Sequence, residues 1–265
     1  MRLWSLVLGP WSFFSSPLSK EILYRRNAVR ECLRAGRRKL HRLVIAEEAD
    51  LAGLQDLVAE ARRRKLPIER TTKKELNLAT HGEPHQNILL EVGPYPYSDL
   101  TEIMDRAAAR GELPFLLLLD LVQDPRNVGA LLRTAEAAGA HGIVIQERRG
   151  CEITPTVVTT SAGATEHLLV AQVTNLVEAI RWLKQHEVWV AGLALTPEAQ
   201  ALDEADLNRP LGLVIGNEGD GLRRLVRERC DFLVTLPMFG HVESLNAAVA
   251  GSIALYTARQ ARNPK

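Results

Sequence analysis

Cysteine is scarce in this sequence, with Cys32, Cys151 and Cys230 as the only examples among 265 residues. The three lie far apart, and the chain has neither a CxxC pair nor a histidine pattern beside a cysteine. The spacing therefore predicts neither a disulfide framework nor a structural zinc site, and we expect no metal. Unpaired cysteines fit a reducing compartment, so we expect a cytoplasmic protein.

Long hydrophobic runs are also absent. A membrane-spanning helix needs about 20 consecutive apolar residues, and no window of the chain approaches that length. The apolar start, MRLWSLVLGPWSFFSSP, is interrupted by Pro10 and has no convincing small-residue cleavage site. We predict no membrane association and interpret residues 1–19 as a flexible leader, with mitochondrial import as the alternative.

Standard phosphate-binding loops are missing as well. The stretch LVIGNEGDGL, residues 213–222, places Gly216, Gly219 and Gly221 at a GxxGxG spacing. A dinucleotide site would have GxGxxG and an acidic residue about 20 positions later, and a P-loop would have GK followed by Ser or Thr. The spacing disfavours a dinucleotide-dependent oxidoreductase. Taken alone, the stretch is also compatible with a simple turn that exposes Glu218.

The charge is balanced overall but uneven along the chain. The formal net charge is +1, yet residues 20–42 hold nine Lys or Arg against two Glu, and residues 62–65 add another basic block. Such a region either faces a polyanion such as RNA or simply solvates helix faces. An apolar content of 46% is ample for a packed core.

Two prolines divide the chain. Pro94 and Pro96, in VGPYPYSDL, cannot lie inside a helix or a central strand and indicate a linker. Before them, the patterns predict helices at 28–35 and 54–64, a helix opened by TKKE, and strands in LHRLVIA, residues 67–70 and NILLEV. We predict a small α/β domain over residues 20–93 and a linker over 94–112.

The second half alternates short apolar runs with helical stretches. The runs FLLLLDL, GIVIQ, VWVAGL, LGLVIG and FLVTLP are predicted strands buried on both faces. This alternation is typical of a mainly parallel sheet covered by helices, so we predict an α/β domain over residues 113–262. In such sheets the ligand site lies at the carboxyl ends of the strands.

Three loops at predicted carboxyl ends carry unusual residues. The glycine-rich stretch with Glu218 is one. Another is LDLVQDPRNVGALLRTAEAAGA, which places Asn127 and Arg133 on a helix of small and aliphatic residues. We expect Arg133 to be partly covered and paired with a carboxylate or a phosphate.

The third loop is VTLPMFGHVESLNAAVAGSIALYTARQ, where Ser244 and Asn246 precede a helix rich in Ala and Gly. Ser244 has a simple structural explanation as the helix cap. His241 and Glu243 lie in the same loop, and we assign neither a role.

Together the three loops resemble the motifs of one family. The order NxxxLLRTAxxxG, VIGNEGxGL and LPMxGxVESLNxxVA is similar to that of the SpoU or TrmH class of SPOUT RNA ribose 2′-O-methyltransferases. The first half resembles the substrate-binding domain of the ribosomal RNA guanosine methyltransferases of that class. Its HGEPHQNILLEV has Asn87 where G-x-x-H-Q-G-V has glycine, and YRRNAVRECL has Arg26 or its neighbour in place of the glycine of G-R-N-A-V.

This resemblance implies a small N-terminal α/β RNA-binding domain, followed by a catalytic domain with a C-terminal trefoil knot. It implies S-adenosylmethionine as methyl donor. The main-chain cofactor contacts would come from Gly216, Leu236 and Leu245. Their expected neighbours at the cofactor are Ile215, Asn217 and Met238.

The resemblance also implies the chemistry and the substrate. Arg133 matches the arginine proposed to activate the ribose hydroxyl, and the other matching motif residues are Asn127, Glu218, Ser244 and Asn246. Because a guanidinium stays protonated in proteins, we favour positioning of phosphate and hydroxyl for Arg133, with Glu218 orienting Arg133 or Asn127. The expected substrate is a guanosine of large-subunit ribosomal RNA, and the expected assembly is a homodimer. Transfer RNA and a non-catalytic role in ribosome assembly are the alternatives.

Overall fold

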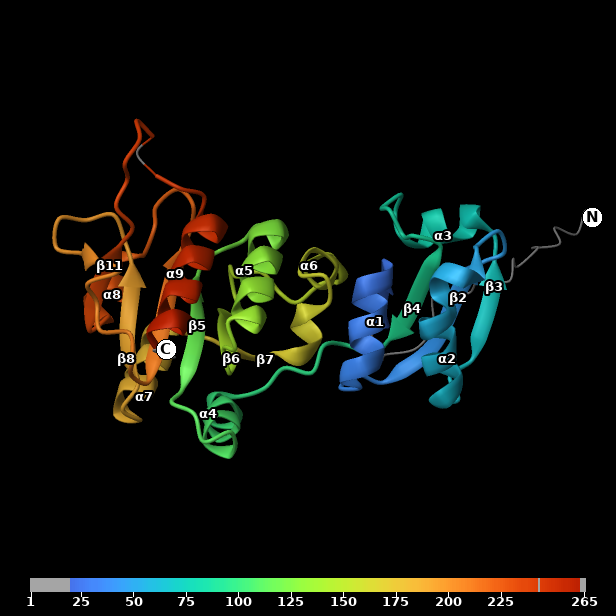
Figure 1. Ribbon diagram of the computed structural model, residues 1–265, viewed down its shortest axis with the longest axis horizontal. Coiled ribbons are helices and arrows are strands. Elements are labelled where there is room, and N and C mark those ends of the chain that lie inside the picture. The colour runs from blue at the N-terminus through green and yellow to red at the C-terminus, as the bar shows by residue number, and fades with distance from the viewer. Residues whose placement is uncertain (1–19, 243, 263–265) are drawn as a thin grey trace, which may run out of the picture.

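A computed structural model describes residues 20–242 and 244–262, and the predicted leader lies outside these residues. Figure 1 shows two α/β units side by side, the first in blue to teal and the second in green to red. Each is built on its own sheet. In the described residues no helix is both long and apolar enough to cross a membrane.

The first unit is a four-stranded sheet with the order β1-β4-β2-β3. β4 pairs antiparallel with β1 and β2, and β2 pairs parallel with β3. α3 begins at a capping box between Thr72 and Glu75, as TKKE predicts. The strands are β1 (Glu21–Tyr24), β2 (Leu40–Ala46), β3 (Ile68–Thr71) and β4 (Ile88–Val92), and the helices are α1 (Arg26–Ala35), η1 (Leu51–Leu54), α2 (Gln55–Arg63) and α3 (Lys73–Ala79).

Five residues of this unit other than glycine have a positive φ, which glycine adopts most easily, and two of them lie within the resembling motifs at glycine positions. Arg25 has φ 72° and Asn87 has φ 64°. These are the positions where the resembling motifs have glycine, so the motif glycines reflect a backbone requirement that this chain meets with other residues. Asn tolerates a left-handed conformation better than most residues, whereas an arginine there is strained.

The second unit is a seven-stranded sheet with the order β7-β6-β5-β10-β8-β11-β9, and all its strand pairs are parallel. The five predicted runs form β5, β6, β8, β10 and β11. The sequence patterns missed β7 and the two-residue β9. The strands are β5 (Phe115–Asp120), β6 (Gly142–Gln146), β7 (Leu169–Val173), β8 (Trp189–Leu193), β9 (Gln200–Ala201), β10 (Leu211–Gly216) and β11 (Phe232–Thr235).

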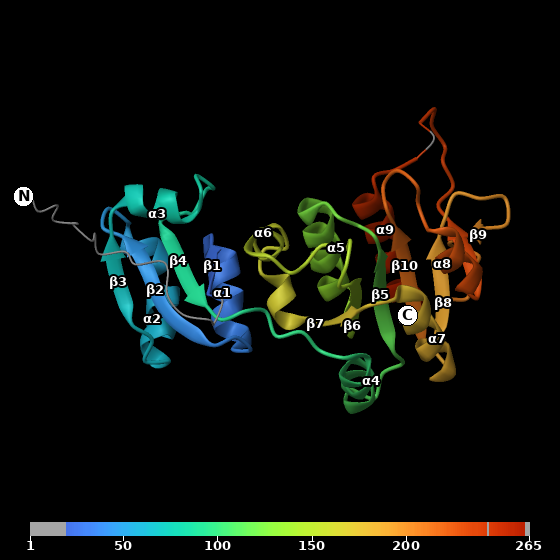
Figure 2. The same ribbon diagram turned by 180° about the vertical axis from the view of Figure 1, so that it is seen from behind.

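Helices cover both faces of this sheet, as Figures 1 and 2 show. Side chains alternate along each strand, so Leu117 and Leu119 pack with α5 and α9 while Leu116 and Leu118 pack with α4, α7 and α8. The strands are therefore apolar on both sides. The helices are α4 (Leu100–Ala109), α5 (Pro125–Ala137), α6 (Pro155–Thr160), η2 (Ala164–His167), α7 (Leu176–Gln185), α8 (Arg224–Arg229) and α9 (Ala247–Arg262).

The segment between the two sheets contains more structure than its prolines indicate. Residues 94–112 include α4, which begins at the cap residue Asp99 and buries Ile103 against the second sheet. Asp99 accepts a hydrogen bond from the Glu102 amide at 2.8 Å. This helix therefore belongs to the packing of the second unit.

The two units meet in a polar junction beneath α1. Arg38 and Glu166 have fully buried side chains, and Arg38 Nε donates to both Glu166 carboxylate oxygens at 3.0 and 3.1 Å. The Tyr95 hydroxyl donates to the Leu168 carbonyl at 2.9 Å, and His167 Nε2 lies 2.9 Å from Glu31 Oε2. A buried ion pair with its hydrogen bonds fixes the first unit relative to the second.

Candidate cofactor and RNA site

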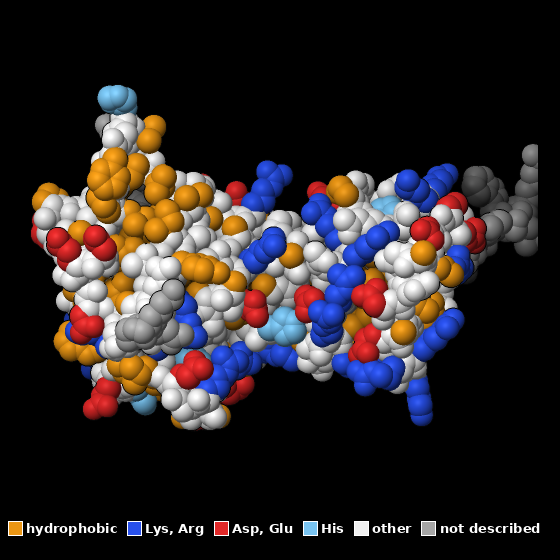
Figure 3. All heavy atoms as spheres, in the orientation of Figure 1, with side chains coloured by type: hydrophobic (Ala, Val, Ile, Leu, Met, Phe, Trp, Pro, Cys, Tyr) orange, Lys and Arg blue, Asp and Glu red, His pale blue; other side chains and the backbone are white. Residues whose placement is uncertain are grey.

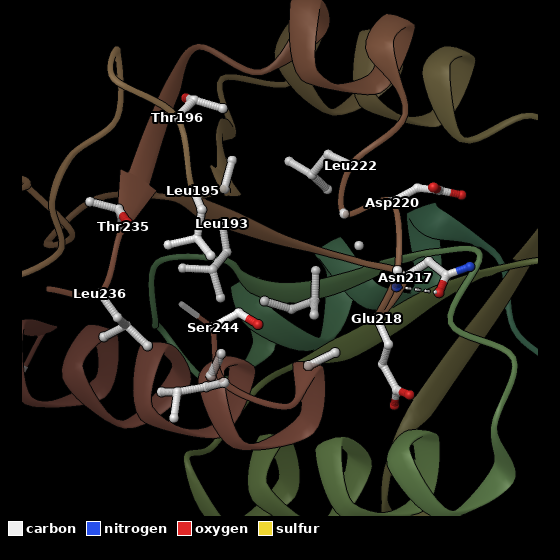
Figure 4. Close-up of a pocket in the computed structure, with 18 of the residues that line it drawn as sticks. Leu193, Leu195, Thr196, Asn217, Glu218, Asp220, Leu222, Thr235, Leu236 and Ser244 are labelled. Carbon is white, nitrogen blue, oxygen red and sulfur yellow. Dashed lines mark hydrogen bonds between the residues drawn. The ribbon is translucent and has the colours of Figure 1, made fainter. Parts of the chain in front are cut away.

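A pocket of about 370 Å³ opens at the carboxyl ends of β8, β10 and β11, the edge that the parallel-sheet rule predicts. Figure 4 shows apolar side chains such as Leu193, Leu195 and Leu236 on one side and the loop of Glu218 on the other. The six residues predicted to bind the cofactor all line it. They are Ile215, Gly216, Asn217, Leu236, Met238 and Leu245.

The loop after β10 is tightly folded, and Gly216 is where it requires glycine. Asn217 and Gly221 exchange backbone hydrogen bonds of 3.1 and 3.0 Å, and Asn217 Oδ1 accepts from the Gly219 amide at 3.2 Å. A Cβ on Gly216 would lie 2.2 Å from the carbonyl carbon of Gly221. Glycine is needed here because the loop folds back on its own backbone, which the sequence pattern alone did not reveal.

Asn246 joins the three motif loops. Its Nδ2 donates to Asn127 Oδ1 and to Glu218 Oε1, each at 3.3 Å. Its Oδ1 accepts from the amides of Ala248 and Val249 at 2.9 and 3.2 Å, which caps α9. One amide thus ties the start of α5, the β10 loop and the start of α9 together.

Ser244 does not cap α9, so its predicted structural explanation was wrong. The capping oxygen belongs to Asn246, two residues later. Ser244 is exposed and lines the pocket, where Figure 4 shows it close to α9. Its hydroxyl is available to a bound molecule.

Arg133 is exposed, and the expectation that it would be partly covered was wrong. Within residues 20–242 and 244–262 its guanidinium has no ion pair or hydrogen bond, so Glu218 does not orient it. Six residues at about 100° each place Arg133 roughly 120° around α5 from Asn127 and about 9 Å further along the axis. Glu218 instead connects to Asn127, the other partner expected from the sequence, and Asn246 bridges the two side chains.

A second anchor of the pocket loop was not predicted from the sequence. Asp120, at the end of β5, is fully buried. Its two oxygens accept from the Arg223 backbone amide at 2.8 Å and from Arg223 Nε at 2.7 Å. Arg223 Nη2 also donates to Gln146 at the end of β6, at 3.1 Å. Since Arg223 follows Leu222 of the pocket wall, this cluster holds the loop over the cofactor pocket.

The pocket suits S-adenosylmethionine. Its volume lies within the range of about 300 to 1,000 Å³ that is usual for ligand sites. Apolar walls suit an adenine ring, and the carboxylates of Glu218 and Asp220 at the pocket suit a sulfonium and an ammonium group. In the part of the chain that the structure describes, no group of three or more His, Cys, Asp and Glu could hold a metal ion.

Comparison with known proteins identifies the family. A model of the SpoU rRNA Methylase family matches residues 114–256, more than half of the chain. The chain belongs to this family. A second model, for RNA 2′-O ribose methyltransferase substrate binding, matches residues 22–98.

Related SpoU proteins cover almost the whole chain. YacO of Bacillus subtilis, named as a TrmH-family tRNA/rRNA methyltransferase, is 42% identical over 242 residues, which are 90% of this chain and 95% of YacO. An AdoMet-bound rRNA methyltransferase from Sinorhizobium meliloti has 25% identity and a TM-score of 0.74, covering 91% of this chain and 87% of its own. The SpoU methyltransferase AviRb of Streptomyces viridochromogenes with AdoMet has a TM-score of 0.77 at 24% identity, covering 92% and 90%.

These comparisons confirm three predictions: the family, the mixed α/β fold with a small N-terminal unit, and S-adenosylmethionine as the cofactor. The protein is thus an S-adenosylmethionine-dependent RNA methyltransferase of the SpoU/TrmH family.

Proposed function

We propose that this protein methylates a ribose 2′-hydroxyl in RNA, and that the target is a guanosine of large-subunit ribosomal RNA. The observation that carries the proposal is the cluster of Asn127, Glu218 and Asn246, called the Asn246 cluster below, which brings the three motifs together beside the pocket. The match of residues 22–98 to a ribose methyltransferase substrate-binding model supports the 2′-O position.

The chemistry requires placement more than a strong base. S-adenosylmethionine supplies a methyl group on a positively charged sulfur. The protein has to hold the ribose hydroxyl in line with that methyl and help its proton to leave. Glu218 and Ser244 both line the pocket and present oxygens that can accept hydrogen bonds from a ribose. Asn127 and Asn246 hold Glu218 in position.

Arg133 acts on the RNA in this proposal. Its guanidinium has no partner among the described residues and is exposed, so a phosphate next to the reacting nucleotide can bind it bidentately. A protonated arginine lowers the energy of an adjacent developing oxyanion but is a poor base. We therefore assign Arg133 to positioning the phosphate and the hydroxyl.

We propose that residues 20–93 bind the RNA substrate, that residues 94–112 connect the two units, and that residues 113–262 carry out the methyl transfer, as the sequence predicts.

We also propose a C-terminal trefoil knot. The support for the knot is that three segments line the same pocket, namely the loop after β8, the loop after β10 and the segment after β11. A crystal structure traced through residues 236–246 tests the knot. A cytoplasmic location fits the three free cysteines.

A homodimer is the proposed assembly. α9 exposes Val249, Ile253 and Tyr256, which follow each other at helical spacing on one side. Figure 3 shows hydrophobic side chains gathered over α9 and the loop above it. Sedimentation should give a dimer for the wild type and a monomer for Ile253→Lys. A wild-type monomer at concentrations well above those of an activity assay would contradict the dimer.

The substrate is tested by offering large-subunit ribosomal RNA and transfer RNA separately with labelled S-adenosylmethionine, followed by nucleoside analysis. We expect 2′-O-methylguanosine from ribosomal RNA. Relatives are named for both RNA classes, so product from transfer RNA alone would replace the ribosomal target and keep the reaction. A methylated base instead of a methylated ribose would overturn the proposal.

A further inference from the structure

A second cavity, of about 440 Å³, lies at the opposite edge of the seven-stranded sheet from the cofactor pocket. It is lined by residues that directly precede β6 and β7, at the amino ends of these strands, and by the last turn of α4. The methyl transfer chemistry does not involve it, and of the fixed motif residues only Gly139, the last glycine of NxxxLLRTAxxxG, lines it. The lining consists of Arg106, Ala109, Arg110, Glu136, Gly139, Ala140, His167 and Leu168.

The wall of this cavity carries two arginines without carboxylate partners. Arg106 is half-buried and is held in place because its Nη1 donates to the His167 carbonyl at 3.0 Å. Arg110 follows four residues later, on the same side of α4. Across residues 20–242 and 244–262, Arg106 makes no ion pair and the Arg110 side chain makes neither an ion pair nor a hydrogen bond. Like charges at this spacing repel each other.

A third cation, Arg37, adds to the positive electrostatic potential at the cavity. Arg37 donates to the carbonyls of Leu168 and Pro96 at the junction of the two units, so it stands next to Arg106 without neutralising it. Burial, Arg37 and Arg110 together lower the pKa of Arg106. Glu136 is the one acidic residue in the lining, and in the described chain it forms no ion pair. The cavity therefore has an excess of positive charge.

We propose that this cavity binds a phosphate group through Arg106 and Arg110. Guanidinium groups match phosphate oxygens in shape and charge, and a phosphate between the two arginines would relieve their repulsion. Two sources can supply the group, namely the backbone of bound RNA or a free phosphate. Figure 3 shows Lys and Arg side chains beside α4 and along the lower side of the N-terminal unit, a pattern that favours an RNA backbone.

The RNA source rests on the proposed function, whereas phosphate binding does not. The test uses the full-length protein without S-adenosylmethionine, so that binding is measured apart from methyl transfer. Arg110→Gln is the main variant, because the Arg110 side chain has no hydrogen bond or ion pair in the described fold that its loss would break. Glu136→Gln is the matched control, because it removes the opposing charge from the same cavity. Thermal unfolding first verifies that both variants fold.

Two titrations are then compared. The first measures the affinity for a ribosomal RNA fragment over a series of salt concentrations. For Arg110→Gln we expect a several-fold weaker affinity and a salt slope smaller by about one, and for Glu136→Gln a tighter affinity. The second measures the rise in melting temperature with inorganic phosphate, which should saturate for the wild type and not for Arg110→Gln.

The outcomes separate the sources. Changes in both titrations support the RNA backbone, and a change in the phosphate titration alone supports free phosphate. If neither titration distinguishes Arg110→Gln from the wild type, the site does not exist. A protein that binds phosphate here but methylates no RNA would overturn the proposed function and leave this site standing.

Discussion

Replacing Gly216 by alanine should weaken cofactor binding strongly. A Cβ at this position would lie 2.2 and 2.3 Å from the carbonyl carbon and oxygen of Gly221 and 2.5 Å from the amide nitrogen of Leu222. Optimal contacts of this kind are about 3.5 to 4.0 Å, so the two backbone segments must separate by roughly 1 Å. Unlike the end of a long side chain, these backbone atoms cannot rotate away.

The size of the effect follows from the cost of overpacking. Inserting a methyl group into a packed site costs about 1 to 3 kcal/mol. If the loop relaxes in the free protein, cofactor binding has to restore it against that cost. A cost of about 2 to 3 kcal/mol corresponds to a dissociation constant roughly 30 to 150 times higher. Isothermal titration with S-adenosylmethionine measures this directly, and thermal unfolding shows whether the variant is folded.

Gly219→Ala is the matched control in the same loop. A Cβ on Gly219 would have no heavy atom of the protein within 4 Å, and its φ is not in the left-handed region. We expect its affinity for the cofactor to stay within about threefold of the wild type. Equal losses in both variants, or an unchanged Gly216→Ala variant, would refute the argument that close backbone approach shapes this pocket.

Three further predictions concern other parts of the fold. Glu166→Gln should lower the free energy of unfolding by about 3 kcal/mol in denaturant titrations, because it removes the fully buried carboxylate partner of Arg38 and leaves that charge paired with Glu21 alone; a loss below about 1 kcal/mol would contradict this. Arg223→Ala should raise the dissociation constant for S-adenosylmethionine about tenfold, because the pocket loop loses the side-chain bonds to Asp120 and Gln146 and keeps only the backbone bond to Asp120, and calorimetry that shows an unchanged affinity would refute it. Burial lowers the pKa of His141, so folding favours its neutral form. The contribution of this form to the free energy of unfolding is complete above the unfolded pKa of about 6.5. It is lost as the pH falls from there through the lowered folded pKa. The free energy of unfolding should therefore fall less between pH 7.5 and pH 5.5 for His141→Gln than for the wild type. An equal fall in both proteins would exclude this role for His141.

The sequence predicted the main strands of the second sheet because each is a continuous apolar run. β10 and β5, for example, are buried along their whole length. β7, LVAQV, is as apolar as β6, GIVIQ, and its sequence could have predicted it, whereas β9 has only two residues and cannot be recognised alone. The edge of the sheet where the pocket opens also followed from the sequence, since it depends only on strand direction.

The details of the candidate site required the fold. Composition suggested that Arg133 would be covered, but which side of α5 is covered depends on where α9 packs, and α9 lies more than 100 residues away. Ser244 and Asn246 are both good cap residues, and only the position where α9 begins decides between them. The Asp120–Arg223 anchor joins residues 103 apart, and no local pattern predicts such a pair.

The proposed function requires the Asn246 cluster and Arg133 to act in methyl transfer to a ribose hydroxyl. The most direct test is single-turnover transfer from labelled S-adenosylmethionine to large-subunit ribosomal RNA, with cofactor affinity measured beside it for the wild type, Arg133→Ala and Asn246→Ala. We predict 2′-O-methylguanosine from the wild type. For Arg133→Ala we predict at least a hundredfold slower transfer, with cofactor affinity within about threefold, because a positioned charge of this kind contributes about that much. Transfer at the wild-type rate by both variants would show that neither Arg133 nor Asn246 acts in the reaction.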